Sequence, residues 1–399
     1  ELLYLTDSGG IGLEGLNPDA SCELQGPLAD FNLPEPVDPR TLDLEAVLEA
    51  FRDLQKDGTA LVLLGAAMRA ALCHFQPATC SVYLQGTTGT FKSAAAGVLQ
   101  GFWGPKFDGA SLPANWSSTA NALEKTAFLA KDCLLVVDDF VARGTRQEVA
   151  YLHRKAEGLF RAQGNQSGRS RLTAKLEVRN AFHPRGMILA TGEDVPNGHS
   201  LQARLVIVNV ARGAIDTSVL SQLQKLARSG HLATIMASFV QWLAAEAKED
   251  KLTEFIEMAL ECDHKNIGSG GHARTQDNLA NLLTGLRIFL DFAEDAGVMN
   301  SSRVQGFMDS ATDAARSLAA MQASMDQEAS DAQRFIDLIR VAVSSGKAHI
   351  ESKFGGEPEN PRTLGWRKVE THSGFRSEAM GSRIGWADKD AIYIDPGAS

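Results

Sequence analysis

The stretch Cys80–Ser93, CSVYLQGTTGTFKS, constrains the fold of this 399-residue chain more than any other. Ser81–Leu84 alternate polar and apolar residues and predict a short strand, and an Ala-rich helical run begins at Lys92. A glycine-containing loop between a strand and a helix turns backbone N–H groups and the positive end of the helix toward one anion. We therefore predict a phosphate-binding loop here.

The loop differs at one position from the pattern G-x-x-x-x-G-K-[ST], because Phe91 stands where the second glycine belongs. We expect Lys92 to reach the outer phosphates of a nucleotide and the Ser93 hydroxyl to bind Mg²⁺. A glycine turn followed by an ordinary surface lysine is the alternative for this stretch taken alone. The residues expected to contact ATP are Gly86, Thr87, Thr88, Gly89, Thr90, Phe91, Lys92 and Ser93.

The composition is that of an ordinary soluble globular protein of two or three domains, with 44% hydrophobic and 22% charged residues. The five cysteines form no C-x-x-C pair, and no uncharged apolar run reaches membrane-spanning length. We therefore expect reduced cysteines, a cytoplasmic protein and no membrane partner. Because the chain starts without Met and stops soon after the strand-like IYID, we also expect a fragment of a larger protein.

Two adjacent acids end a second apolar stretch, CLLVVDDF, at Cys133–Phe140. Four consecutive aliphatic residues predict a strand that is buried on both faces and delivers carboxylates at its C-terminal end. In phosphate-loop ATPases a carboxylate in this place binds Mg²⁺ and a neighbouring group acts on the attacking water. We assign Asp138 to the metal, together with Ser93, and Asp139 to water activation. A solvated Asp-Asp turn is the alternative for this stretch alone.

A basic segment lies near the middle of a chain whose net charge is −10. From Arg161 to Arg185 there are six Lys or Arg residues against one acid, Glu177. The Gly-, Asn- and Ser-rich residues 164–168 predict a turn between strands and therefore a basic hairpin. Such a hairpin can grip nucleic-acid phosphates without reading sequence, and a solvated charged face is the alternative. The residues expected to contact nucleic acid are Arg169, Arg171 and Lys175.

Three further polar residues stand at the ends of predicted elements. Thr191 ends an apolar strand within residues 186–194, where it can orient an attacking water. Arg204 directly precedes another apolar strand, so it either pairs with a neighbouring carboxylate or acts across a subunit interface. Arg274 opens a helical run, where a cation is electrostatically unfavourable, and this favours a role elsewhere over a plain surface charge.

Helical periodicity predicts amphipathic helices over Leu42–Gln55 and Ala60–His74, and a mainly helical region from Asp216 to about Met325. Glycine, proline and aromatic residues with short strand-like pieces follow Lys347. We therefore expect an α/β protein. The expected parts are a linker or the tail of a missing upstream domain over 1–40, an ATPase core with a parallel sheet between helices over 41–215, a helical lid over 216–325, and a small winged-helix-like domain over 326–399.

Taken in order, these motifs resemble those of the AAA+ P-loop ATPases over roughly residues 60–300. Within that class the chain resembles superfamily-three and minichromosome-maintenance-like helicases, nearest to primase-associated helicase-like proteins of bacterial plasmids, phages and integrated elements. In that comparison GTTGTFKS resembles Walker A, LLVVDDF resembles Walker B, and Arg169–Lys175 resembles the DNA-facing hairpin before sensor 1. Thr191 falls at sensor 1, Arg204 at the arginine finger and Arg274 at sensor 2. The departures are Phe91, a Thr where Asn is more usual at sensor 1, and no Phe-Asp after Arg204.

The resemblance implies a hexameric ring that binds ATP and Mg²⁺ between subunits, with Arg204 reaching the γ-phosphate of a neighbour's nucleotide. We expect an ATP-hydrolysing, ring-forming motor, a DNA helicase or translocase that acts on single-stranded or forked DNA in the replication of a mobile genetic element. A primase or polymerase domain, fused or in trans, is a further expected partner. The expected catalytic residues are Lys92, Asp139, Thr191 and Arg204. The alternatives are an AAA+ ATPase that remodels or loads proteins, a P-loop small-molecule kinase, and a regulatory scaffold with an inactive phosphate loop.

Overall fold

The computed structural model describes residues 2–168, 171–172, 178–179, 182–247, 251–268, 273–371 and 374–398. The chain divides into two compact units, Glu1–Ala323 and Ser324–Ser399. The first unit holds every motif singled out above. Its expected division into a core and a helical lid stays a prediction.

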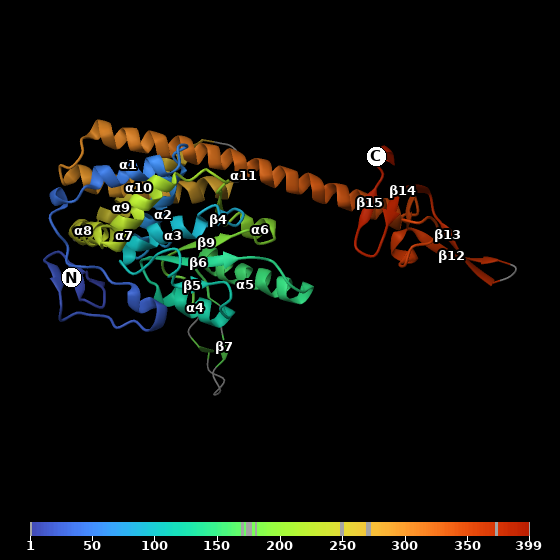
Figure 1. Ribbon diagram of the computed structural model, residues 1–399, viewed down its shortest axis with the longest axis horizontal. Coiled ribbons are helices and arrows are strands. Elements are labelled where there is room, and N and C mark those ends of the chain that lie inside the picture. The colour runs from blue at the N-terminus through green and yellow to red at the C-terminus, as the bar shows by residue number, and fades with distance from the viewer. Residues whose placement is uncertain are drawn as a thin grey trace. The chain divides into compact units, whose positions relative to one another are not determined.

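A five-stranded parallel sheet in the order β10-β4-β9-β6-β5 forms the centre of the first unit (Figure 1). Its strands are β4 (Ser81–Gln85), β5 (Ala114–Asn115), β6 (Leu134–Phe140), β9 (Met187–Gly192) and β10 (Leu205–Asn209). The registers of β4 with β9 and β9 with β6 bring Leu84, Thr191 and Ala190 to the same end of the sheet. The carboxyl-terminal ends of β4, β9 and β6 therefore lie side by side at one end of the sheet.

The strands are apolar because helices cover both faces of the sheet, as a buried parallel sheet requires. In Figure 1, α2 (Thr59–Ala71) and α3 (Lys92–Gln100) lie on one side, and α4 (Ala120–Leu129) and α5 (Arg146–Asn165) lie on the other. The single turn α6 (His199–Gln202) precedes β10. The predicted α/β class with a parallel sheet between helices is confirmed.

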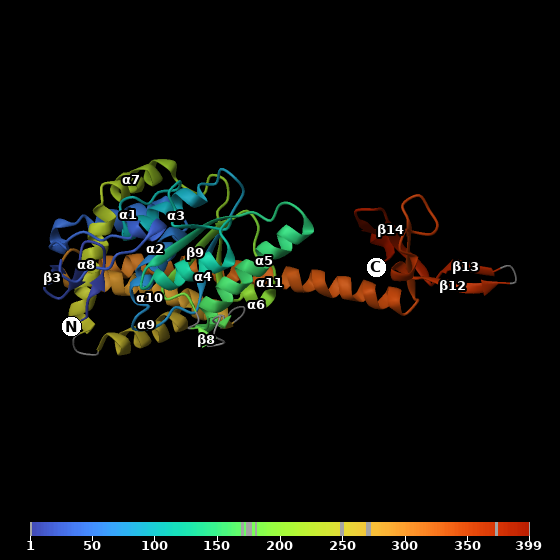
Figure 2. The same cartoon turned by 90° about the horizontal axis from the view of Figure 1, so that it is seen from below.

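Helices outside the sheet layer make up most of the rest of this unit, as the periodicity predicted (Figure 2). They are α1 (Leu44–Leu54), α7 (Thr217–Arg228), α8 (His231–Glu246), α9 (Lys251–Ile267), α10 (Ala273–Asp295) and α11 (Ser301–Ser344). The helices α2 and α10 approach backbone to backbone at Gly65 and Gly285. A Cβ on Gly65 would lie well inside contact distance of the Leu282 carbonyl oxygen, and a Cβ on Gly285 would meet the Gly65 carbonyl oxygen. Only glycine fits at this crossing.

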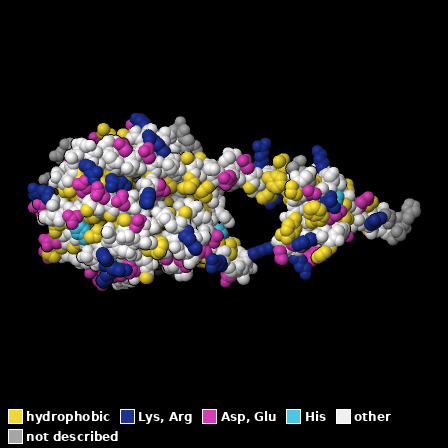
Figure 3. Space-filling model, turned by 45° about the horizontal axis from the view of Figure 1, so that its top comes forward, with side chains coloured by type: hydrophobic (Ala, Val, Ile, Leu, Met, Phe, Trp, Pro, Cys, Tyr) yellow, Lys and Arg dark blue, Asp and Glu magenta, His cyan; other side chains and the backbone are white. Residues whose placement is uncertain are grey.

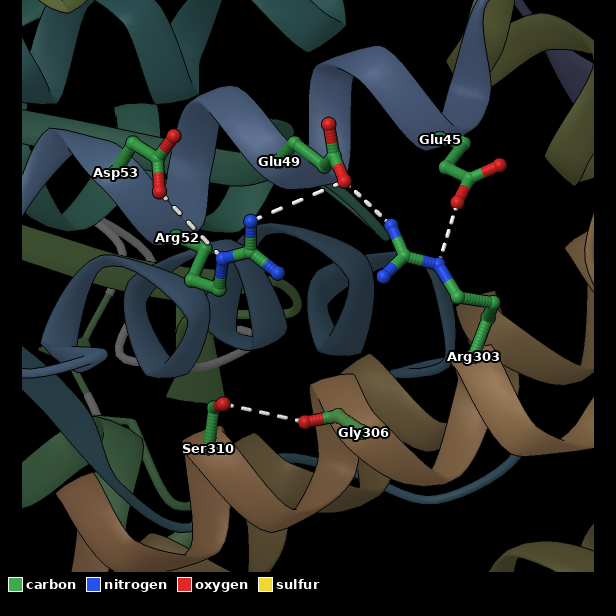
Figure 4. A network of polar contacts seen from close by, with 7 residues as sticks. All are labelled: Glu45, Glu49, Arg52, Asp53, Arg303, Gly306 and Ser310. Atoms are coloured by element: carbon green, nitrogen blue, oxygen red, sulfur yellow. Dashed lines mark hydrogen bonds and ion pairs between the residues drawn. The ribbon is translucent and has the colours of Figure 1, made fainter.

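Charged contacts fasten α11 to α1 (Figure 4). Arg303 Nε donates to Glu45 Oε1 across 2.5 Å, and its Nη2 donates to Glu49. Arg52 of α1 also reaches Glu49, at 3.8 Å. Elsewhere on the first unit, Lys and Arg are interspersed with Asp and Glu on the face that Figure 3 shows. That face therefore carries no continuous basic field.

The expectation that residues 1–40 form a linker is wrong for the described part of that segment. It contains the three-stranded antiparallel sheet β1 (Tyr4–Leu5), β2 (Gly10–Gly12) and β3 (Gly15–Asn17). Ile11 and Leu33 are almost completely buried in the same core as the central sheet. Isolated apolar residues among glycine, proline and aspartate carry no periodicity, so no helical or strand pattern predicted this packing.

Residues 164–168 do not form the predicted turn between two strands, because they are the end of α5 and the turn that directly follows it. A capping box fixes the start of this helix, with Thr145 and Glu148 exchanging hydrogen bonds. Two short antiparallel strands follow, β7 (Arg171–Leu172) and β8 (Val178–Arg179). A hairpin is therefore present, a few residues later than the turn signal placed it.

The second unit begins within α11 and continues as β-structure. Its strands are β11 (Ala348–Ser352), β12 (Trp366–Thr371), β13 (Gly374–Ala379), β14 (Ser382–Ala387) and β15 (Ile392–Ile394). They form a three-stranded sheet, β11-β14-β15, and a β12–β13 hairpin. The described residues after α11 contain only strands, turns and short 3-10 helices, so a winged helix is not confirmed. None of the helices in the described ranges is long and apolar enough to cross a membrane.

Candidate functional site

The loop between β4 and α3 has the tight geometry that an anion-binding turn requires. A Cβ on Gly86 would lie 2.5 Å from the Val210 carbonyl oxygen and 2.7 Å from Thr90 Oγ1, so this position must be glycine. Gly89 adopts a positive φ of 86°. Thr90 Oγ1 donates to the Thr87 carbonyl oxygen across 3.0 Å and closes the turn.

Phe91 explains why glycine is usual in its place. Its φ is +65°, a left-handed conformation that costs a side-chain-bearing residue on the order of 1 kcal/mol or more. The side chain is 47% exposed. The loop therefore keeps its backbone shape with Phe91 present, and the ring lies at the surface instead of filling the turn.

Lys92, the first residue of α3, is buried and crosses the loop, with Nζ donating to the Thr87 carbonyl oxygen at 3.0 Å. Desolvation lowers the pKa of Lys92, and the carboxylates of Glu193, Asp138 and Asp139 oppose that shift. The ammonium group therefore lies in the field of three carboxylates at the carboxyl-terminal end of the sheet strands.

A cluster of three side chains joins the two predicted motifs. Ser93 Oγ donates to Asp138 Oδ1 at 2.8 Å, and Thr191 Oγ1 donates to the same oxygen at 2.5 Å. Asp138 lies two residues before the end of β6, where its backbone pairs with Asn115 of β5, and the pairing of β6 with β9 is interrupted between Val137 and Phe140. Ser93 and Asp138 together offer the hard oxygen ligands that Mg²⁺ prefers.

Asp139 turns away from Asp138 because β6 bulges between Val137 and Phe140. Its φ is +68° and its side chain is exposed, whereas its backbone N–H donates to Thr191 Oγ1 at 3.1 Å. The structure therefore gives the two acids different surroundings. Within the described residues no group of three His, Cys, Asp or Glu side chains could hold a metal ion alone. Mg²⁺ delivered with phosphates needs only one or two protein ligands, so Ser93 and Asp138 fit that role.

Two residues of the site were not anticipated. Glu193, directly after β9, accepts a hydrogen bond from Thr88 Oγ1 in the loop, and Arg143 Nη2 donates to its other oxygen at 2.6 Å. The Thr88 bond lowers the pKa of Glu193, and the charges of Arg143 and Lys92 lower it further. Its position in the sequence could have indicated this role, because Glu193 lies two residues after Thr191, at the same end of the sheet.

Arg204 lies at the amino-terminal end of the sheet strands, whereas the phosphate loop follows the carboxyl-terminal end of β4. It directly precedes β10, whose first residue, Leu205, pairs with Ser81 at the start of β4. The side chain is buried and donates to the Ser200 hydroxyl and to Asn165 Oδ1, each at 2.9 Å. Desolvation lowers the pKa of Arg204, and the charges of Arg274 and Arg161 lower it further.

Arg274 stands in the first turn of α10, beside Arg204. One turn later, the Asn278 side chain donates to the Ala203 carbonyl oxygen at 3.0 Å, which fixes the start of α10 next to the start of β10. The structure therefore does not bring Arg274 to the phosphate loop of its own chain. As a ligand for the same chain's nucleotide, this prediction is not supported.

The predicted nucleic-acid contacts lie mostly outside the described residues, as Arg169 and Lys175 do. Arg171 begins β7, and its backbone pairs with Arg179 of β8. The contact of these three residues with nucleic acid stays a prediction.

A parallel sheet in which β4 leads through a glycine loop into Lys92-Ser93, with Asp138 beside that serine, has the arrangement of a phosphate-loop core. A family model described as "Domain of unknown function (DUF927)" matches residues 52–175, a range that includes the loop and both acids. No curated protein matches.

Among solved structures, "SCCmec type IV Cch - active helicase" aligns with a TM-score of 0.52 and 14% identity over 89% of this chain. The chain spans 65% of the length of that protein. "The X-ray structure of JCV Helicase" aligns over 51% of this chain and 64% of that chain, at 15% identity and a TM-score of 0.25, which carries no argument. The first likeness shows that the chain shares its fold with a helicase.

Proposed function

We propose that this chain binds ATP with Mg²⁺ and hydrolyses it. The observation that carries the proposal is the convergence of Ser93, Asp138 and Thr191 beside Lys92, because it unites three separate segments at the edge where the glycine loop opens. Mg²⁺ bound with the nucleotide neutralises charge on the outer phosphates. Ser93 and Asp138 would hold it, and Lys92 would bind the same phosphates.

Hydrolysis needs a group that positions water, and Asp139 is the residue we assign to it. Its side chain is exposed, and its backbone N–H donates to Thr191 Oγ1, which also donates to Asp138. Thr191 would therefore keep the metal-binding acid and the water-activating acid in a fixed relation. A positioned base of this kind contributes about 10²–10⁴-fold to a rate.

The chain would act as a ring in which one copy supplies arginine residues to the nucleotide of the next. Arg204 and Arg274 lie at the edge of the sheet opposite their own phosphate loop, so they can serve a nucleotide only on a neighbouring copy. Arg204 is engaged with Ser200 and Asn165 in the single chain. Use of Arg204 in trans therefore requires those two hydrogen bonds to be exchanged when subunits meet.

DNA translocation is the activity that best unites these features with the shared helicase fold. The β7–β8 hairpin belongs to the segment with six basic residues, and it follows α5. We propose a ring-forming DNA helicase or translocase, with replication of a mobile element as its setting. A primase or polymerase partner belongs to the same proposal.

The test is Mg-ATP turnover by the purified chain with and without single-stranded DNA. Stimulation by DNA supports the helicase, and a rate that DNA leaves unchanged favours the protein-remodelling alternative. Lys92→Ala is the control that must abolish turnover in both conditions. Turnover that survives in that variant would belong to a contaminant.

A further inference from the structure

Glu193 bridges the tip of the phosphate loop to the segment that follows β6. One carboxylate oxygen accepts from Thr88 Oγ1, and the other accepts from Arg143 Nη2 at 2.6 Å. The backbone is fixed as well, because Glu193 N–H donates to the Phe140 carbonyl oxygen at 3.0 Å. The carboxylate is therefore held over the loop from two sides.

The charge of Glu193 competes with that of a nucleotide. Three carboxylates raise the pKa of Lys92, and Glu193 has the largest effect of the three. Lys92 is also the group that the outer phosphates need. Because like charges near one cation disfavour each other, the carboxylate opposes the binding of a phosphate that reaches both Lys92 and Thr88.

We propose that Glu193 is a positioning residue that holds Thr88 while the phosphate loop is empty, and that the terminal phosphate of a nucleoside triphosphate displaces it. Arg143 is the anchor, because its bond to the second oxygen lets the carboxylate leave Thr88 without becoming unpaired. A diphosphate lacks the displacing group and leaves the Thr88 bond in place. The Thr88–Glu193 hydrogen bond would therefore be broken by a nucleoside triphosphate and kept with a diphosphate. This inference rests on the nucleotide binding proposed above.

Glu193→Gln separates charge from shape, because the amide oxygen can still accept from Thr88 while the negative charge is gone. Calorimetry with a non-hydrolysable Mg-ATP analogue and with Mg-ADP measures both affinities. The affinity for the triphosphate should rise by about tenfold and that for ADP by less than about twofold, as the loss of one like charge near a phosphate predicts. Glu193→Ala, which also removes the acceptor, should shift the ratio in the same direction. Glu261→Gln, an exposed acid on α9, is the matched control and should change neither affinity.

An equal gain for both nucleotides would assign Glu193 a general charge effect and overturn the proposal. Unchanged affinities in both variants would overturn it too. These outcomes differ from a failure of the proposed function, in which the unaltered chain itself binds neither nucleotide.

Discussion

Ser93 Oγ lies 2.8 Å from Asp138 Oδ1, although the two residues are 45 positions apart in the sequence. The serine lies in the first turn of α3, after β4, and the aspartate lies near the end of β6, with β9 between the two strands. A shift of either strand by one residue would separate the pair, because it would turn the side chain to the other face. The hydrogen bond between Ser93 and Asp138 therefore depends on the register of the sheet strands.

Asp139→Asn should slow hydrolysis without preventing nucleotide binding. We expect turnover to fall by about 10²–10⁴-fold, the usual contribution of a positioned base. The affinity for Mg-ATP should change little, because Asp138 and Ser93 keep their bond. Single-turnover kinetics with calorimetry separates the two quantities. Asp313→Asn, an exposed acid of α11, is the control and should leave both unchanged. Loss of binding in Asp139→Asn would mean that Asp139 shares the metal site.

Arg204→Ala should abolish turnover in a ring while the nucleotide still binds, since an arginine supplied in trans is worth about 10³–10⁵ in rate. Mixing Arg204→Ala subunits with Lys92→Ala subunits should restore part of the activity. Each mixed interface can then combine an intact phosphate loop with an intact arginine. The measurement is ATPase rate against the mixing ratio.

Thermal unfolding must accompany that experiment, because Arg204 is buried and bonded to Ser200 and Asn165. A lowered melting temperature in the variant would indicate a structural part for the guanidinium. If Arg204→Ala folds normally and turns over at the unaltered rate, the finger assignment is wrong.

Gly65→Ala should destabilise the first unit by about 1–3 kcal/mol, the usual cost of overpacking. The added methyl group would meet the Leu282 backbone, which cannot rotate away as a side chain can. Gly306→Ala is the matched control, because no atom lies within 4 Å of the position where its Cβ would be built. It should gain about 0.5–1 kcal/mol from helix propensity. Urea unfolding of both variants measures the difference, and equal effects would contradict the close crossing.

Asp291 gives the protein a pH-dependent stability. Burial raises the pKa of this carboxyl to about 6, against the attraction of Arg287. The folded state then binds a proton more tightly than the unfolded state, so stability should fall as the pH rises from about 4 to about 6. Asp291→Asn should remove this slope and be more stable at pH 7 by about 1–2 kcal/mol, because the carboxylate keeps some solvent screening. Denaturant unfolding at several pH values tests it, and parallel curves for both proteins would contradict it.

The arrangement of the candidate site could be predicted from sequence because its residues lie near the ends of strongly apolar strands. Asp138 and Thr191 follow aliphatic runs that predict a parallel sheet, and parallel strands bring their carboxyl ends together. Glu193 was missed because its role depends on Thr88 and Arg143, which only the fold places beside it. A loop contact of this kind has no periodicity in the sequence.

Burial and packing were harder to predict than strand ends. Arg204 reads in sequence as a charge before a strand, yet hydrogen bonds to Asn165 and Ser200 allow it to be buried. The close crossing at Gly65 and Gly285 joins residues from distant helices, so local propensity could not reveal it. The helix α5 was missed although Thr145 and Glu148 form its capping box, a signal present in the sequence.

Calorimetric titration with Mg-ATP, on the unaltered chain and on Ser93→Ala, tests the central claim most directly. We predict saturable heat at one site per chain, and for Ser93→Ala an affinity that no longer depends on Mg²⁺. Removal of the hydroxyl leaves Asp138 without one of its two donors and the metal without one of its two protein ligands. Absence of heat with the unaltered chain, or the same Mg²⁺ dependence in both proteins, would contradict a metal-nucleotide site at Ser93 and Asp138.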